Sequence, residues 1–130
     1  MAKYILAVCI LVMVGCASIS EINQKDQFKK TAYAYKQALQ WGDWVSASGK
    51  LDSDGKELDY GKIDELKQIK VTSYEVNAMK LSEDKLQGQQ TVEIQYYHIN
   101  RMLEKALIDK QVWAYDEEKG WRLASGLPSF

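Results

Sequence analysis

The sequence contains no long basic run, no long apolar run and very little histidine or cysteine. Its 17 basic and 18 acidic side chains are mixed along 130 residues and leave a formal net charge of −1. We expect no nucleic acid partner, because a phosphate backbone is bound by clustered basic side chains. The longest apolar run, residues 5–14, spans about 15 Å as a helix, roughly half of a bilayer's hydrocarbon core, so it is not an ordinary transmembrane anchor.

Metal ligands are scarce as well. His98 is the only histidine and there are two cysteines, whereas a structural zinc site uses four histidine or cysteine ligands. The acidic stretch 52–59 resembles a calcium loop only superficially. Aligning Gly55 with the turn glycine of an EF-hand places Lys50 and Gly61 where acidic ligands are required. We therefore expect neither a metal nor another cofactor.

The amino terminus combines a positive charge, a short apolar segment and a cysteine. Lys3 precedes the apolar residues 5–14, and the small residue Gly15 and then Cys16 follow them. This order is typical of a secretory signal peptide. The letters MVGC at 13–16 resemble the lipobox of bacterial lipoproteins, with methionine where leucine is usual. In that motif the cysteine is diacylated on sulfur before the peptide is cut in front of it.

The resemblance implies that residues 1–15 are a signal peptide and that Cys16 is the acylated first residue of the mature chain. Cys9 is then lost, which leaves no free thiol for a disulfide, a nucleophile or a metal site. Two or three acyl chains give stable attachment, because each buried methylene contributes about 0.8 kcal/mol. Ala17, rather than aspartate, after the cysteine implies the outer membrane, with the domain facing the periplasm. The alternatives are an ordinary signal peptide with a fortuitous cysteine, and a cytosolic chain with a buried apolar helix.

The mature chain is predicted to begin with helices. Residues 17–24 form a short polar tether, and Asn23 with Asp26 resembles a helix-capping pair. Apolar residues then recur at helical spacing until Trp41, where a Gly-Asp pair ends the helix. We therefore expect residues 16–25 to be an acylated tether and residues 26–130 to be a single domain.

Two shorter helices and four strands complete the expected order. Asp43 and Asp59 are the predicted N-caps of the two shorter helices. The helix that Asp59 caps contains Ile63, Leu66 and Ile69. The apolar period then changes to two, which predicts strands at 71–81, 89–102, 103–115 and 121–125, with a bend or bulge near Asn100. Helices followed by an antiparallel meander make an α+β domain.

This order resembles the nuclear transport factor 2-like superfamily, which includes the ketosteroid isomerases. The letters YKQALQWGD at 35–43 close the first helix as in that superfamily. The letters YYH at 96–98, YDEEKGWRL at 115–123 and GLP at 126–128 are closest to small proteobacterial lipoproteins of that fold without an assigned activity. The resemblance covers residues 26–127 and implies N-terminal helices packed on a curved antiparallel sheet that forms a cone.

The same resemblance suggests a catalytic tyrosine. Tyr35, Leu39 and Asp43 have the spacing found in ketosteroid isomerases, where the tyrosine helps to hold an oxyanion. That mechanism also needs a carboxylate base in a dry pocket, and the strand acids are Glu75, Glu93 and Asp109. His98 is a second candidate, as a general base. The alternative, under which no residue is catalytic, makes Tyr35 a core aromatic whose hydroxyl reaches a strand and His98 an ordinary strand residue.

Aromatic residues indicate a second type of site. A cavity for a flat or lipid-like ligand at the mouth of the cone could be lined by Tyr35, Trp41, Trp44, Tyr96, Trp113 and Trp121. The alternative is that these side chains only pack the helices on the sheet. Tyr96 and Tyr97 point to opposite strand faces. One of them is therefore exposed or meets a partner, and this fold often dimerises through its sheet.

We therefore expect a membrane-tethered periplasmic lipoprotein that acts as a non-catalytic binding or envelope-interaction module. Its partners would be the membrane, through acylated Cys16, and an apolar small molecule or an envelope protein, with a homodimer through the sheet as a further possibility. The alternative function is a small pocket enzyme of the ketosteroid isomerase or dehydratase kind that uses Tyr35 and His98.

The lipobox interpretation predicts the outcome of changing Cys16. Cys16→Ser should abolish metabolic labelling with palmitate and leave the uncleaved precursor in the inner membrane, because the signal peptidase requires the acylated cysteine. Cys9→Ser is the matched control and should be labelled and cut normally. A mature mass that is unchanged by Cys16→Ser would contradict the interpretation.

Overall fold

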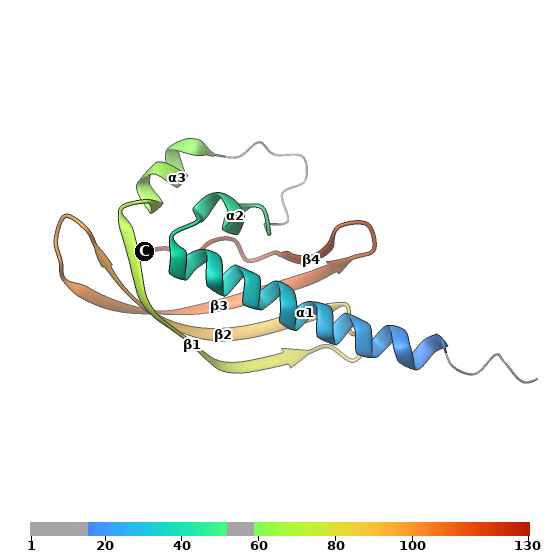
Figure 1. Ribbon diagram of the computed structural model, residues 1–130. Helices are drawn as coiled ribbons and strands as arrows, with labels where there is room; N and C mark the ends of the chain where they lie inside the picture. Colours follow the sequence, from blue (N-terminus) through green and yellow to red (C-terminus); the bar gives the residue numbers. More distant parts are fainter. Residues whose placement is uncertain (1–15, 52–58) are drawn as a thin grey trace, which may run out of the picture.

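Three helices precede four strands in the computed structural model, which describes residues 16–51 and 59–130. The elements are α1 (Cys16–Trp41), α2 (Trp44–Ser48), α3 (Tyr60–Leu66), β1 (Ile69–Leu81), β2 (Gln87–His98), β3 (Glu104–Asp116) and β4 (Gly120–Leu123) (Figure 1). The expected α+β class and order of elements are confirmed. The predicted signal peptide, 1–15, and most of the acidic loop, 52–58, lie outside the described residues.

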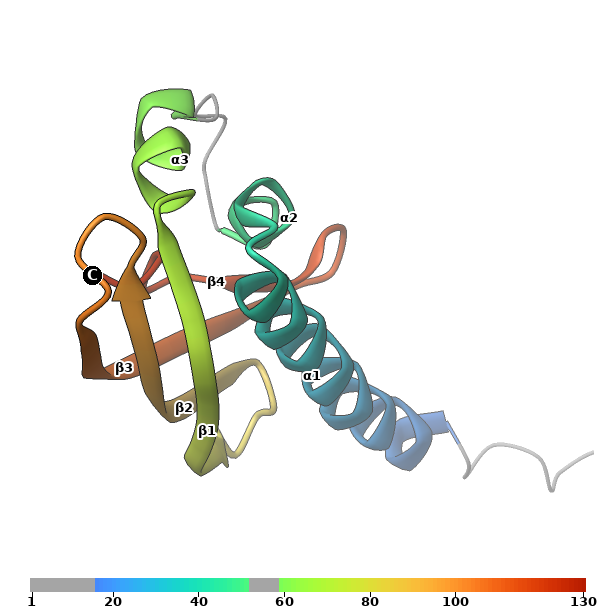
Figure 2. The same ribbon diagram turned by 60° about the vertical axis from the view of Figure 1, so that its left-hand side comes forward.

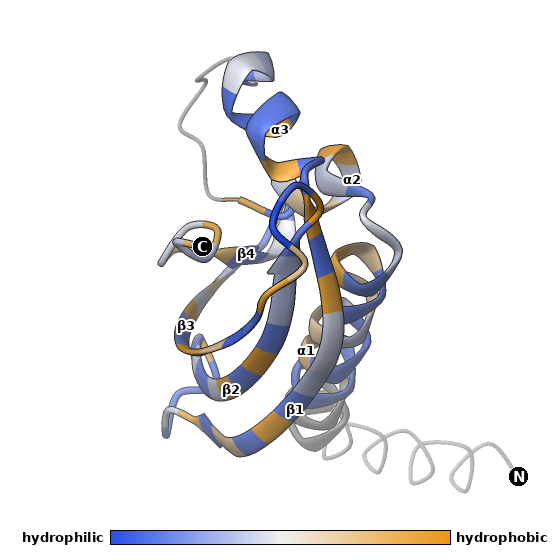
Figure 3. Cartoon of the chain, turned by 90° about the vertical axis from the view of Figure 1, so that its left-hand side faces the viewer, coloured by the Kyte–Doolittle hydropathy of each residue, from blue (hydrophilic) through white to orange (hydrophobic). Residues whose placement is uncertain are grey.

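The four strands form one antiparallel sheet in chain order, which is a meander. Its curvature comes with two register shifts in β1, one between Val71 and Ser73 and one between Val76 and Ala78. Such bulges bend a strand and increase its twist. α1 lies across one face of the curved sheet (Figures 1 and 2). Hydrophobic and hydrophilic residues alternate along the strands, so the two faces differ in polarity (Figure 3).

The region around Asn100 is a reversal between two strands and not a bend within a ribbon. β2 ends at His98, whose carbonyl accepts the amides of Arg101 and Met102 at 2.9 and 3.0 Å. Met102 has φ +52°, in the left-handed region. The prediction that this strand reaches residue 102 is wrong, because the exposed apolar residues Ile99 and Met102 in the turn extend the apolar pattern beyond the strand.

α1 is longer than the sequence predicts. The expected tether at 17–24 and the helix start near Asn23 are wrong, because the helix begins at Cys16 and runs through both. None of its 26 residues is glycine or proline, so nothing within it interrupts the backbone ladder. The first turns of α1 extend past the edge of the sheet (Figure 1).

The end of α1 is as predicted. Gly42 has φ +72°, a conformation that glycine adopts without steric cost. The next amide, of Asp43, turns back and donates to the Ala38 carbonyl at 2.8 Å, which satisfies one of the last helical acceptors. Asp43 then caps α2, because its side chain accepts the Ser46 amide at 3.1 Å.

α3 is capped by Asp59, as predicted, through the Lys62 amide at 3.2 Å. The helix is shorter than expected. It ends at Leu66, and Ile69, which was expected on it, is the first residue of β1. Ile69 is paired there with His98 of β2, so a partner that is distant in the sequence decides its conformation.

Phe28 joins α1 to the sheet. Its ring is fully buried and meets the rings of Trp113 and Trp121 edge-on, with centroids 6.1 and 4.8 Å away. Beneath it lies Gly88 of β2, where an added Cβ would lie only 2.7 Å from the Phe28 ring. The Trp121 indole N–H also donates to the Gln24 carbonyl at 3.0 Å, which ties β4 to the same stretch of α1.

Residues 124–130, which we call the closing segment, return to the interior after β4. Pro128 is buried, and the Phe130 ring packs edge-on against Trp44 of α2 and Tyr96 of β2, with centroid distances of 5.6 and 4.8 Å. The end of the chain therefore closes the space between the short helix and the sheet.

The close approach of Phe28 to Gly88 predicts the effect of adding one methyl group. Gly88→Ala should lower the free energy of unfolding by about 1 to 3 kcal/mol, since ring and strand must separate to make room. Gly61→Ala, whose new Cβ meets only Asp59 Oδ1 at 3.4 Å, is the control and should be neutral or stabilising. Urea unfolding measures both. Equal stability of the two variants would mean that α1 is not seated on Gly88.

Candidate functional site

Tyr35 lies in the interior between α1 and the sheet. It is 0% exposed, and its ring meets Trp113 edge-on with centroids 5.5 Å apart. Its hydroxyl has no hydrogen-bond partner within the described residues. Burial, and then the nearby Asp109 and Tyr74, raise the pKa of Tyr35 well above its ordinary value. The hydroxyl is therefore neutral, and the prediction that it reaches a strand partner is wrong.

Gln111 of β3 organises the polar groups around Tyr35. Its amide nitrogen donates to Tyr74 Oη at 2.8 Å and to Asp109 Oδ2 at 3.0 Å. Its amide oxygen accepts hydrogen bonds from the Trp113 indole N–H at 3.1 Å and from the side-chain amide nitrogen of Gln90 at 3.3 Å. Gln111 is itself buried, so every polar end of its side chain is satisfied inside the fold.

Burial is also the main influence on the acids of this network. It raises the pKa of Tyr74 to about 12, against the opposing effect of the hydrogen bond from Gln111. It raises the pKa of Asp109 too, and the bond from Gln111 again opposes the shift. The interior therefore favours neutral side chains, which is the setting that an acid–base pair requires but also one that simple packing produces.

The predicted catalytic constellation is only partly assembled. Of the three strand acids, Asp109 alone shares the helix-facing side of the sheet; Glu75 and Glu93 are paired with each other on the opposite face. His98 lines two clefts near Phe130, and Tyr35 lines neither of them. Within residues 16–51 and 59–130, no histidine, cysteine, aspartate and glutamate side chains gather into a group suited to a metal ion.

The aromatic candidates do not share one cavity. Trp41 is 83% exposed at the end of α1, because it follows the buried Leu39 by two residues and therefore lies on the other side of the helix. Trp44 and Trp113 are buried in the core, as the packing alternative requires. Tyr96 and Trp121 each border a cleft, but the two clefts have no residue in common.

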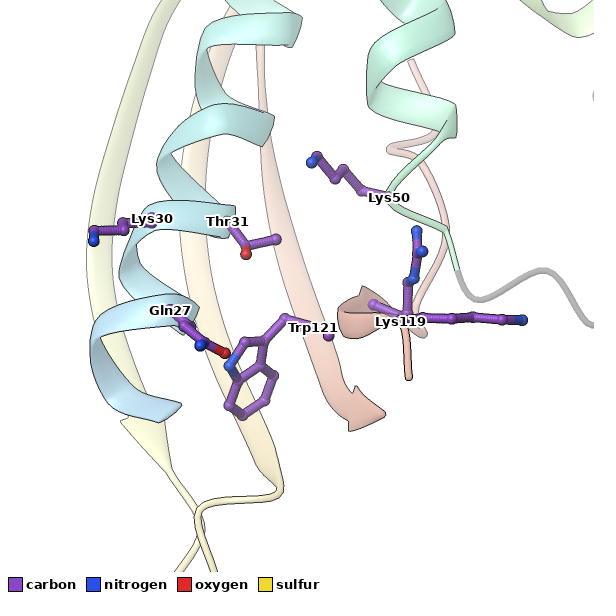
Figure 4. Close-up of a pocket in the computed structure, with 8 residues that line it drawn as sticks. Gln27, Lys30, Thr31, Lys50, Lys119 and Trp121 are labelled. Carbon is purple, nitrogen blue, oxygen red and sulfur yellow. The ribbon is translucent and has the colours of Figure 1, made fainter. Parts of the chain in front are cut away.

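The cleft beside Trp121 lies where α1, the residues after α2 and β4 meet. It has a volume of about 250 Å³, and Gln27 and Thr31 of α1 face Trp121 across it (Figure 4). Arg122 beside it donates to the Gly49 carbonyl at 2.5 Å. This bond and the one from Trp121 to α1 hold β4 against the helices, so the contacts at this cleft are explained by packing.

A larger cleft, which we call the mouth cleft, opens beside the closing segment. Its volume is about 500 Å³, and it is lined by Ile69, Tyr96, His98, Asn100, Arg101, Leu103, Lys105 and Phe130. A neighbouring cleft of about 360 Å³ shares Ile69, His98 and Phe130 with it. Figures 1 and 2 show the end of the chain beside the connection between β2 and β3 that forms the rim.

The mouth cleft combines an apolar floor with a polar rim. Tyr96 was predicted as a pocket residue, and His98 was singled out for another role. Phe130 was missed, because an isolated aromatic after GLP belongs to no periodic pattern. Arg101 and Lys105 were missed as well, since nothing in the local sequence brings a turn and a strand start to the same cleft.

Comparisons with known proteins leave the family open. No family model, curated protein or solved structure is significantly similar to the chain. In the part of the chain that the structure describes, every helix is too short or too polar to span a lipid bilayer. The function must therefore be argued from the residues of the site.

Removing the hydroxyl of Tyr74 and removing that of Tyr35 should change the free energy of unfolding differently. Tyr74→Phe should cost about 1 kcal/mol of unfolding free energy, because it deletes the bond from Gln111. Tyr35→Phe should leave the unfolding free energy unchanged or raise it by about 1 kcal/mol, because it deletes a buried hydroxyl that makes no bond. Urea unfolding at neutral pH compares them. A loss in Tyr35→Phe as large as that in Tyr74→Phe would show that Tyr35 makes a polar contact that matters.

Proposed function

We propose that the chain is a lipid-anchored binding module of the bacterial envelope, attached to the outer membrane through acylated Cys16 and facing the periplasm. The charged start, the apolar residues 5–14 and the small residue before Cys16 support the anchor. We further propose that residues 26–130 form a nuclear transport factor 2-like cone. The helices on one side of a curved antiparallel meander support this finer assignment.

The helical start of α1 supports an anchored arrangement. Between Cys16 and Phe28, whose ring is buried on the sheet, α1 rises about 18 Å at 1.5 Å per residue. A helix is stiffer than a polar tether, so it would hold the domain at a distance from the bilayer. Its first turns and the closing segment lie toward opposite ends of the molecule (Figure 1). The mouth cleft would then face away from the membrane.

The mouth cleft is the observation that carries the binding function. Its volume of about 500 Å³ falls in the usual range for small-molecule sites, about 300 to 1,000 Å³. The floor of Ile69, Tyr96 and Phe130 offers apolar contact, whereas the interior behind it is filled by Trp44 and Trp113. We infer that a small apolar molecule binds at the mouth of the fold and not inside it.

A pocket enzyme is the alternative function. The charge of Asp109 contributes to the raised pKa of Tyr35, so a carboxylate and a neutral phenol do lie near one another in the interior. A substrate would nevertheless have to reach Tyr35, which has no exposed surface and packs against Trp113. The non-catalytic function needs no such opening, and we therefore prefer it.

The outer face of the sheet supports the proposed protein partner. Ile108 and Val112 of β3 are exposed there, on the face opposite the buried residues of β2, and Tyr97 is half-buried on the same face. We propose that this face meets a second copy of the chain or an envelope protein.

Binding of a neutral apolar probe tests the mouth cleft. The full chain in nanodiscs of zwitterionic lipid should enhance the fluorescence of N-phenyl-1-naphthylamine beyond that in empty nanodiscs. Leu103→Gln, at a 62% exposed rim position, should weaken binding about tenfold, since roughly 1.4 kcal/mol of apolar contact is lost.

Val45→Gln is the matched control, because Val45 is 51% exposed on α2 and lines neither the mouth cleft nor the cleft beside it. It should bind the probe as the unchanged chain does. No binding above the empty nanodiscs, or equal losses in the two variants, would refute the site.

A further inference from the structure

The charged side chains that line the mouth cleft are basic. Arg101, in the turn after β2, and Lys105, near the start of β3, both line it, and none of the described aspartates or glutamates does. Lys105 is paired with Tyr96 across the two strands, so its Cα is fixed beside the aromatic floor. Arg101 is fixed by its amide, which donates to the His98 carbonyl at 2.9 Å.

Glu104, next to Lys105 in the sequence, and Glu65, in the neighbouring cleft, form no salt bridge with these cations. Glu104 accepts a hydrogen bond from Thr72 at 3.0 Å, and its strand position places it on the other face from Lys105. Glu65 lines the neighbouring cleft together with Lys62. Among the described residues, neither Arg101 nor Lys105 forms a salt bridge, and the two that are formed lie on α1 and at α3.

His98 and Asn100 add donors to the same rim. The Asn100 backbone amide donates to His98 Nδ1 at 3.4 Å, which leaves Nε2 as the ring nitrogen that can donate to a ligand. The Asn100 side chain donates one hydrogen to Gln68 Oε1 at 3.4 Å and has a second one left. The rim therefore offers hydrogen-bond donors and two positive charges above an apolar floor.

We propose that the mouth cleft binds an amphipathic anion with a single hydrocarbon chain, such as a long-chain carboxylate or a monoacyl phosphate. The anionic head would be held by Arg101 and Lys105, and the chain would lie on Ile69, Tyr96 and Phe130. Carboxylate and phosphate oxygens accept charge-assisted bonds from guanidinium and ammonium groups, which are stronger than neutral ones. This inference rests on the proposed binding function and adds the charge and shape of the ligand to it.

Three ten-carbon compounds with different heads test the inference. Decanoate, decanol and decylamine are titrated calorimetrically into the full chain in zwitterionic nanodiscs, with empty nanodiscs to correct for partition. Decanoate should bind at least tenfold more tightly than decanol, and protonated decylamine most weakly. Decyl phosphate, run beside decanoate, shows which anionic head is preferred, and tighter binding of either anion than of decanol supports the proposal.

Two double variants separate charge from packing. Arg101→Gln with Lys105→Gln should reduce the affinity for decanoate to that for decanol and leave decanol unchanged. Lys70→Gln with Lys110→Gln, at exposed positions on the other sheet face, is the control and should keep the full preference for decanoate.

The outcomes distinguish this inference from the binding function on which it rests. Equal binding of decanol and decanoate, or a preference that survives in the rim double variant, overturns the charge selectivity while the apolar site stands. A preference for decylamine overturns it as well. Binding of none of the compounds removes both the inference and the site.

Discussion

The seating of Phe28 on Gly88 is the contact on which the rest of the fold depends. Because Gly88 has no side chain, the ring reaches the backbone of β2, and α1 lies closer to the sheet than any larger residue would permit. Tyr35, seven residues or about two turns further along α1, is then brought against Trp113. Gln24, about one turn before Phe28, offers its carbonyl to the indole of β4. The missing side chain at Gly88 therefore allows Phe28, Tyr35 and Gln24 of α1 to make their contacts with the sheet.

Because α1 lies so close to the sheet, the interior between them is better suited to side-chain packing than to catalysis. Large aromatic side chains fill it, and Gln111 joins several of the buried polar groups, whereas the Tyr35 hydroxyl and the Trp44 indole N–H have no partner among the described residues. Burial is the first cause of the raised pKa of Tyr35, of Tyr74 and of Asp109, so the interior disfavours charge. The two positive charges of the proposed site, on Arg101 and Lys105, lie instead at the rim of the mouth cleft. We therefore place the proposed ligand at the mouth cleft and not in the filled interior.

The parts of the structure that could be predicted are those that local chemistry decides. The Gly-Asp end of α1, the caps at Asp43 and Asp59 and the strand alternation depend on residues near in sequence, and they are confirmed. Ile69 could not be assigned, because its apolar spacing suits the helix and only pairing with β2 makes it a strand residue. The candidate site was less predictable for the same reason. Its floor includes Phe130, which is placed by contacts with two distant elements.

The proposed anchor and the proposed ligand constrain one another through the length of α1. The helix has 26 residues and can span about 39 Å. The end of the chain, whose Phe130 lines the mouth cleft, lies near the far end of α1 and away from its first turns (Figure 1). If the proposed anchor holds α1 away from the bilayer, a ligand would have to leave the membrane to reach the cleft. Each buried methylene opposes that step by about 0.8 kcal/mol, and a second acyl chain would double the cost. A charged head and a single chain are the features that allow a lipid-like molecule to cross that gap, and they are also the features that the rim and floor of the cleft can hold.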